Sequence, residues 1–122
     1  MGKILFLDDS HERHKKFVMN RIGMVIDQAY SYVDACKLLA EADATTYDAV
    51  WLDHDLSDKA AAGQPDRDEK TGTHVAEFIA QLPDDKRPQR VIIHSFNAAG
   101  ASRMQQILRA AGVSVRVMPF SG

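Results

Sequence analysis

Two short apolar runs, each ending in acidic residues, constrain this chain more than any other feature. The runs and the residues that follow them are Lys3–Leu7 with Asp8 and Asp9, and Ala49–Leu52 with Asp53, His54 and Asp55. A continuous apolar run of this length is typical of a strand that is covered on both faces of a sheet. Because the carboxyl ends of parallel strands lie at one edge of the sheet, the two acidic groups are expected to meet there.

The rest of the chain alternates predicted strands with predicted helices. Further strands are predicted at 24–29, 91–93 and 113–118, and helices at 11–21, from Ser31 onward, 71–82 and 101–111. Ser10 and Ser31 are suited to cap the first two helices. Strands and helices that alternate at this spacing predict an α/β fold in three layers, with a doubly wound, parallel, five-stranded sheet and right-handed crossovers.

The predicted helices show apolar stripes at helical spacing. Phe17, Val18 and Ile22 form the stripe expected to be buried in the first helix, and Val33, Cys36, Leu38 and Leu39 form the stripe of the second. His11 and His14, three residues apart on the first helix, could face the pocket or the solvent, and the surface is favoured.

The acidic residues predict a metal site. Four carboxylates at one sheet edge repel one another unless a cation neutralises them, and oxygen ligands suit Mg²⁺ or Mn²⁺. The predicted ligands are Asp8, Asp9, Asp53 and Asp55. For Asp9 and Asp55 a role as turn or helix-capping residues remains an alternative.

The ends of the third and fourth strands add groups suited to phosphate chemistry. His54 and His94 can transfer protons, and Asp53 can also act as a nucleophile; for His94 the alternative is a hydrogen-bonded core histidine. Ser95, Asn97 and the backbone of Gly100 precede or begin a helix, where N–H groups bind anions. Arg13 follows the first acidic pair closely enough to reach a phosphate.

Composition limits the remaining classes. A chain of 122 residues with 45% hydrophobic residues predicts one globular domain, 1–122. No apolar run is long enough to span a membrane and no secretory signal is apparent, so we expect a cytoplasmic protein with no membrane partner. A net charge of −2 predicts no general nucleic-acid surface. The long polar segment 57–70 is expected to form a mobile loop over the site.

These residues resemble the receiver domains of two-component response regulators. Asp8 and Asp9 match the paired acids after the first strand, Asp53 matches the phospho-acceptor, and Ser95 matches the switch hydroxyl. The resemblance implies the strand order 2-1-3-4-5 of a receiver or flavodoxin-like fold. Met118 stands where receivers have a lysine before a proline, and we expect the last helix of the receiver fold to be lacking. The face that this helix would cover is therefore expected to be an apolar patch that can form a homodimer.

A closer likeness, over essentially the whole chain, is to the receiver-like family named for cyclic-phosphate processing. The stretches that resemble it are Leu7-Asp8-Asp9 with Arg13 and Phe17, Leu52-Asp53-His54-Asp55-Leu56, Thr71-Gly72, His94-Ser95-Phe96-Asn97-Ala98-Ala99-Gly100 with Met104, and Pro119-Phe120. The residues and the likeness together predict a metal-dependent phosphoesterase for cyclic phosphates of nucleotides or RNA ends. The alternative is a non-catalytic receiver-like module that is phosphorylated at Asp53 or binds a phosphorylated ligand.

Overall fold

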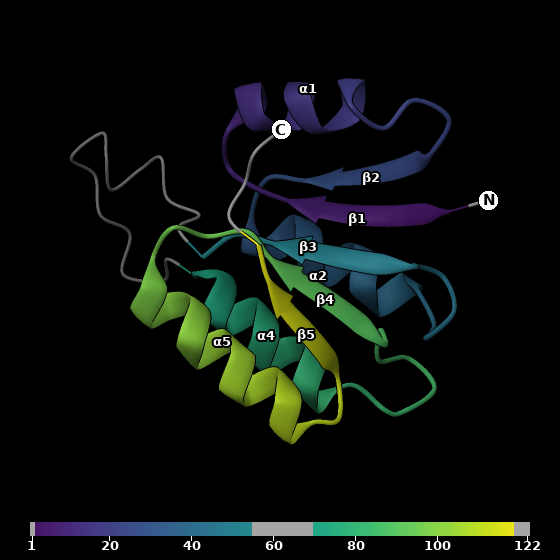
Figure 1. Cartoon of the computed structure of the whole chain (residues 1–122). Helices are drawn as coiled ribbons and strands as arrows, with labels where there is room; N and C mark the ends of the chain where they lie inside the picture. The colour runs from purple at the N-terminus through teal and green to yellow at the C-terminus, as the bar shows by residue number, and fades with distance from the viewer. Residues whose placement is uncertain (1, 55–69, 119–122) are drawn as a thin grey trace.

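The chain folds into alternating strands and helices around one parallel sheet (Figure 1). The structure, a computed structural model, describes residues 2–54 and 70–118. Its elements are β1 (Lys3–Leu7), α1 (His11–Met19), β2 (Val25–Ala29), α2 (Tyr32–Glu41), β3 (Ala49–Leu52), α4 (Gly72–Gln81), β4 (Arg90–Ile93), α5 (Ala98–Ala110) and β5 (Ser114–Val117).

The sheet has the strand order that the sequence predicts. All neighbouring strands are parallel, in the order β2-β1-β3-β4-β5. This confirms the prediction of a doubly wound, five-stranded, receiver-like fold. Among the described residues no helix follows β5. The predicted loop 57–70 lies, except for Lys70, outside the described residues.

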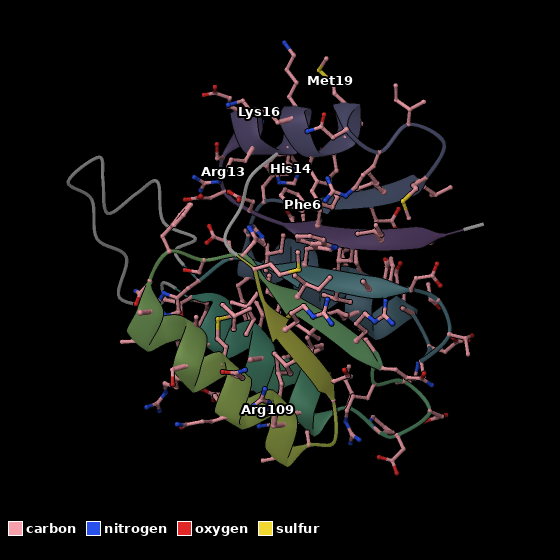
Figure 2. The ribbon with its side chains drawn as sticks, viewed as in Figure 1. Phe6, Arg13, His14, Lys16, Met19 and Arg109 are labelled. Atoms are coloured by element: carbon pink, nitrogen blue, oxygen red, sulfur yellow. The ribbon has the colours of Figure 1, made fainter. Side chains whose placement is uncertain are left out.

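The two faces of the sheet are covered unequally. Helices α2, α4 and α5 pack on one face, and α1 packs on the other, above β1 and β2 (Figure 1). The larger core lies under the three helices and includes Leu5, Leu7, Val50, Leu52, Val91 and Ile93 from alternate strand positions. The smaller core consists of Ile4, Phe6 and Phe17, with Ile26 and Trp51 packed against it. The side chains of Lys16 and Met19 on α1 point away from the sheet (Figure 2).

Two of the predicted apolar stripes were wrong in part. Ile22 is 91% exposed because α1 ends at Met19, and the chain then turns through Gly23, which has a φ of 94°. Val33 is 69% exposed, since the buried side of α2 is formed by Ala35 and Leu39, one helical turn apart. The predicted caps are confirmed: Ser10 accepts a hydrogen bond from the backbone N–H of Arg13.

On the side of the sheet that carries α1, the surface formed by β4 and β5 is only partly apolar. A hollow of about 260 Å³ lies over it, lined by Arg90, Ile92, Ser114, Val115 and Arg116. Arginine and serine side chains therefore interrupt the expected apolar patch, and a homodimer through this face stays a prediction. No helix in the described part of the chain is long and apolar enough to cross a membrane.

The smaller core makes a direct prediction. Phe17 is fully buried, and its ring centroid lies 4.0 Å from that of Phe6 and 5.1 Å from that of Trp51. Phe17→Ala should lower the free energy of unfolding by about 3 to 5 kcal/mol, because a cavity remains where few other side chains can fill it. Ile22→Ala, the exposed control, should change it by less than about 0.5 kcal/mol. Urea unfolding of both variants measures the difference, and equal losses would contradict this account of the core.

Candidate functional site

Three neighbouring strands bring the predicted site residues to one edge of the sheet. The hydrogen bonds between neighbouring strands continue one residue past the end of each strand. The backbone N–H groups of Asp8, Asp53 and His94 donate to the carbonyl oxygens of Ala29, Leu7 and Leu52, respectively, at 3.0 to 3.1 Å. These bonds fix the backbone of Asp8, Asp53 and His94 relative to one another. Side chains at the three strand ends are thus held by the sheet and not by loops alone.

Three of the four predicted metal ligands meet in an acidic cluster. Asp8, Asp9 and Asp53 each offer an oxygen, and these oxygens all lie within 4.8 Å of one another. Asp8 is fully buried and Asp53 is 6% exposed. The fourth predicted ligand, Asp55, lies outside the described residues.

Arg13 lies against this acidic cluster. Its Nε donates to Asp8 Oδ2 at 2.7 Å and its Nη2 donates to Asp8 Oδ1 at 3.0 Å. Nη2 is also 3.6 Å from Asp9 Oδ1 and 3.5 Å from Asp53 Oδ2. The hydrogen bonds to Asp8, followed by the charges of the three carboxylates, raise the pKa of Arg13 despite partial burial. A bidentate arginine of this kind holds a carboxylate in one orientation.

Asp53 has one oxygen that hydrogen bonds do not satisfy. Its Oδ1 accepts the backbone N–H of His54 at 2.9 Å. Its Oδ2 is buried and accepts no hydrogen bond from the described residues. Burial, and next the charge of Asp8, raise the pKa of Asp53 to about 7, although Arg13 opposes the shift. A divalent cation held by Asp8, Asp9 and Asp53 would satisfy the open oxygen and favour the ionised form, so these residues fit such an ion.

His94 is buried beneath the cluster. Its Nε2 lies 3.1 Å from the carbonyl oxygen of Leu7, which can only accept, so Nε2 is protonated. Its ring stacks on Phe6, with centroids 4.9 Å apart, and its Nδ1 is 3.7 Å from Asp8 Oδ2. Burial lowers the pKa of His94 to about 4, so the imidazole is neutral near pH 7. His94 thus has the surroundings of a hydrogen-bonded core histidine, which was the alternative for this residue. Its role in proton transfer stays a prediction.

The surface position that the sequence favoured for His14 is wrong. His14 is 1% exposed, not at the surface, and its Nε2 lies 2.8 Å from the carbonyl oxygen of Asp8. Its Nδ1 is 2.9 Å from Gln28 Oε1, and its ring stacks on Tyr30 with centroids 3.9 Å apart. Figure 2 shows His14 on α1 above Phe6 on β1. The spacing of three residues from Phe17 was the available signal, because it places both side chains on one face of the helix.

The predicted phosphate-binding residues other than Arg13 lie at the start of α5. Ser95 Oγ accepts the backbone N–H of Asn97 at 3.0 Å, and Asn97 Oδ1 accepts the backbone N–H of Gly100 at 2.9 Å. Asn97 Nδ2 lies 3.3 Å from His54 Nδ1. Asn97 therefore caps α5 and contacts His54. The binding of phosphate by Ser95, Asn97 and Gly100 stays a prediction.

Gly72 closes the site from the side of α4. Its N–H donates to the carbonyl oxygen of His54 at 2.8 Å, and a Cβ at this position would lie only 2.0 Å from the carbonyl oxygen of Asp53. Only glycine permits this approach. The Thr71 side chain and His74 form a capping box that starts the helix at this point.

Solved structures of response regulators have the same fold. The chain is 16% identical to a response regulator from Burkholderia pseudomallei with a phosphorylated aspartic acid, calcium ion and citrate, with a TM-score of 0.65 over 99% of this chain and 62% of that one. It is 23% identical to the response regulator TrrA from Thermotoga maritima in complex with Mg²⁺-BeF, with a TM-score of 0.63 over 99% and 90% of the two chains. The chain thus spans less than two thirds of the Burkholderia protein. At these identities the likeness shows the fold alone.

A family comparison is more specific. The cyclic-phosphate processing receiver domain matches residues 3–110. The chain belongs to this family. No curated protein matches the chain. In the described part of this domain, Arg13 from α1 lies beside the paired acids, and Met118, which follows β5, is 41% exposed.

The raised pKa of Asp53 predicts how stability depends on pH without metal. Its pKa in the folded state is about 7, above the ordinary value of 3.8, so its contribution to stability falls as pH rises from about 4 through 7. Asp53→Asn removes this loss. In EDTA, the variant should be more stable than the wild type by a few kcal/mol at pH 8 and by much less at pH 5. Urea unfolding at both pH values checks this, and a difference independent of pH would contradict it.

The pairing of Arg13 predicts a link between stability and divalent ions. Arg13→Gln should lower the free energy of unfolding by about 2 to 4 kcal/mol, because Asp8 keeps a buried charge without its partner; Arg13 is 38% exposed, which reduces the cost. Millimolar Mg²⁺ should restore part of the loss by binding the folded carboxylates.

The matched control for Arg13→Gln is Arg109→Gln, on the exposed side of α5 (Figure 2). This variant should unfold like the wild type in urea, with and without Mg²⁺. If Mg²⁺ stabilises neither the wild type nor Arg13→Gln, the carboxylates do not form an ion site.

Proposed function

We propose that the domain is a metal-dependent phosphoesterase that opens cyclic phosphates of nucleotides or RNA ends. The observation that supports this most is the buried Asp53 Oδ2, without a hydrogen-bond donor among the described residues and within an acidic cluster beside Arg13. Membership of the cyclic-phosphate processing family agrees with a phosphate ligand.

Asp8, Asp9 and Asp53 would hold Mg²⁺ or Mn²⁺. When bound, such an ion polarises a phosphoryl oxygen and lowers the pKa of a bound water. The fourth ligand in this proposal is Asp55. Arg13, already oriented by Asp8, offers a positive charge for the non-bridging phosphate oxygens on the solvent side of the carboxylates.

Ring opening requires two proton transfers. Water forms a new P–O bond and loses a proton, while one P–O ester bond breaks and the leaving ribose oxygen gains a proton. We assign a proton-transfer role to His54, which lies beside Asp53 and is partly exposed. His94 can take part only through Nδ1, because its Nε2 is bonded to Leu7. Ser95, Asn97 and Gly100 lie at the α5 side of the same edge.

A second function is favoured by the receiver-like arrangement of two residues. Asp53 follows β3 and Ser95 follows β4, the positions of the phospho-acceptor and the switch hydroxyl in receivers. A non-catalytic module, phosphorylated at Asp53 or binding a phosphorylated ligand, would use the same acidic cluster without opening a ring.

Phosphorus NMR separates these functions. The protein is incubated with 2′,3′- and 3′,5′-cyclic nucleotides and an RNA 2′,3′-cyclic phosphate, in the presence of Mn²⁺ or Mg²⁺. A phosphoesterase should convert at least one of them to a monoester, and Asp53→Asn should reduce the rate at least 100-fold, a typical loss for a group central to catalysis.

The control is Asp85→Asn, an exposed carboxylate between α4 and β4, which should keep the wild-type rate. Intact rings throughout, with incorporation of phosphate into wild-type protein from acetyl phosphate but not into Asp53→Asn, would favour the receiver-like module. Ring opening that survives in Asp53→Asn would contradict the proposed metal site.

A further inference from the structure

The imidazole of His54 is enclosed by the first turn of α5. Asn97 Nδ2 lies 3.3 Å from His54 Nδ1, and the ring lies so close to Gly100 that a Cβ there would be 2.4 Å from His54 Cδ2. His54 and Gly100 are far apart in sequence, so this contact joins the end of β3 to the start of α5.

The hydrogen bonds of Asn97 determine which nitrogen of His54 is protonated. The backbone N–H of Gly100 can only donate, so the Asn97 atom 2.9 Å from it is the carbonyl oxygen Oδ1. The amide nitrogen Nδ2 therefore faces His54. An amide nitrogen also only donates, and His54 Nδ1 must accept. The neutral ring consequently has its proton on Nε2.

Gly100 is needed for space and not for its backbone conformation. It lies inside α5, and the described glycines with positive φ are Gly23 and Gly112. A glycine within a helix costs about 0.5 to 1 kcal/mol relative to alanine. A Cβ would approach three atoms of the His54 ring at 2.4 to 2.7 Å, below any normal contact. The absence of a side chain thus leaves room for the imidazole.

The backbone of His54 is fixed from two other directions. Its N–H donates to Asp53 Oδ1 at 2.9 Å, and its carbonyl oxygen accepts the N–H of Gly72 at 2.8 Å. The main chain is held by β3 and α4, and the contacts with Asn97 and Gly100 restrict where the ring can lie.

We propose that Asn97 and Gly100 are positioning residues that hold His54 as the Nε2–H tautomer, with Nε2 as the donor to a phosphate oxygen of the ligand. The tautomer follows from the contacts themselves, whereas the identity of the ligand rests on the proposed function. Asn97 and Gly100 then act through His54, and not by binding the phosphate directly.

Asn97→Asp tests the tautomer with almost no change in shape. One carboxylate oxygen still accepts the N–H of Gly100 and caps α5. The other replaces the amide nitrogen and accepts a hydrogen bond, which favours the proton on Nδ1 of His54. Long-range ¹H–¹⁵N NMR of the histidine rings distinguishes the two tautomers, and the His54→Gln variant assigns the resonances.

The expected result is Nε2–H in the wild type and Nδ1–H in Asn97→Asp. Asn97→Ser, which keeps a capping hydroxyl but has no amide nitrogen, should lose the preference seen in the wild type. A wild-type ring protonated at Nδ1, or a tautomer unchanged in Asn97→Asp with the fold intact, would overturn the proposal.

Inorganic phosphate with Mg²⁺ tests the donor role. Addition of phosphate should shift the Nε2 resonance of His54 in the wild type and have little effect on that resonance in Asn97→Asp. No shift of Nε2 at concentrations that perturb Arg13 would overturn the donor role.

The rate of ring opening gives a second, independent test of the positioning role. For any ring that the wild type opens, Asn97→Asp and Gly100→Ala should lower kcat about 10- to 100-fold, the usual effect of residues that support a functional group. A change in KM alone would contradict positioning. If no ring is opened, the proposed function fails, but the NMR result still decides the tautomer and the donor role.

Discussion

Repulsion among carboxylates at the ends of β1 and β3 is the constraint on which the site depends. Asp8 and Asp53 lie at adjacent strand ends because the sheet is parallel and the chain has acids directly after each strand. Their charges are desolvated, and such a group is stable only with a nearby cation or with a proton. Arg13 supplies a cation beside the cluster, yet burial, and next the charge of Asp8, still raise the pKa of Asp53.

The position of Arg13 in turn depends on how α1 packs. Phe17 stacks on Phe6 in the smaller core, and His14 contacts the carbonyl oxygen of Asp8 next to the acidic cluster. These two contacts hold α1 against the sheet. Ser10 begins the helix and donates its N–H to Asp8 Oδ1 at 2.8 Å. The first strand end, the helix cap and the arginine therefore form one hydrogen-bonded unit around Asp8.

The sequence was sufficient to predict the fold and most of the acidic cluster, and the reasons are physical. Apolar runs followed by acids identify parallel strands and their shared edge, so the fold and the meeting of Asp8, Asp9 and Asp53 were predictable. Sequence spacing did not reveal that Arg13 pairs with these acids, because the same spacing also suits a phosphate contact. The exposure of Ile22 depended on where α1 ends, and the contact of His54 with Gly100 is a tertiary one between distant segments. Local pattern cannot specify either.

The site draws its groups from β1, β3 and β4 and from helices that follow each of them. No single hairpin or helix pair contains it, and its geometry exists only when strands distant in sequence are paired. A ligand that requires this geometry binds the folded state and not partly folded fragments, so binding energy is added to the stability of the whole sheet. Occupancy of the site therefore reports on global folding: any variant that weakens the sheet, however far from the carboxylates, also lowers apparent affinity once the unfolded fraction becomes appreciable.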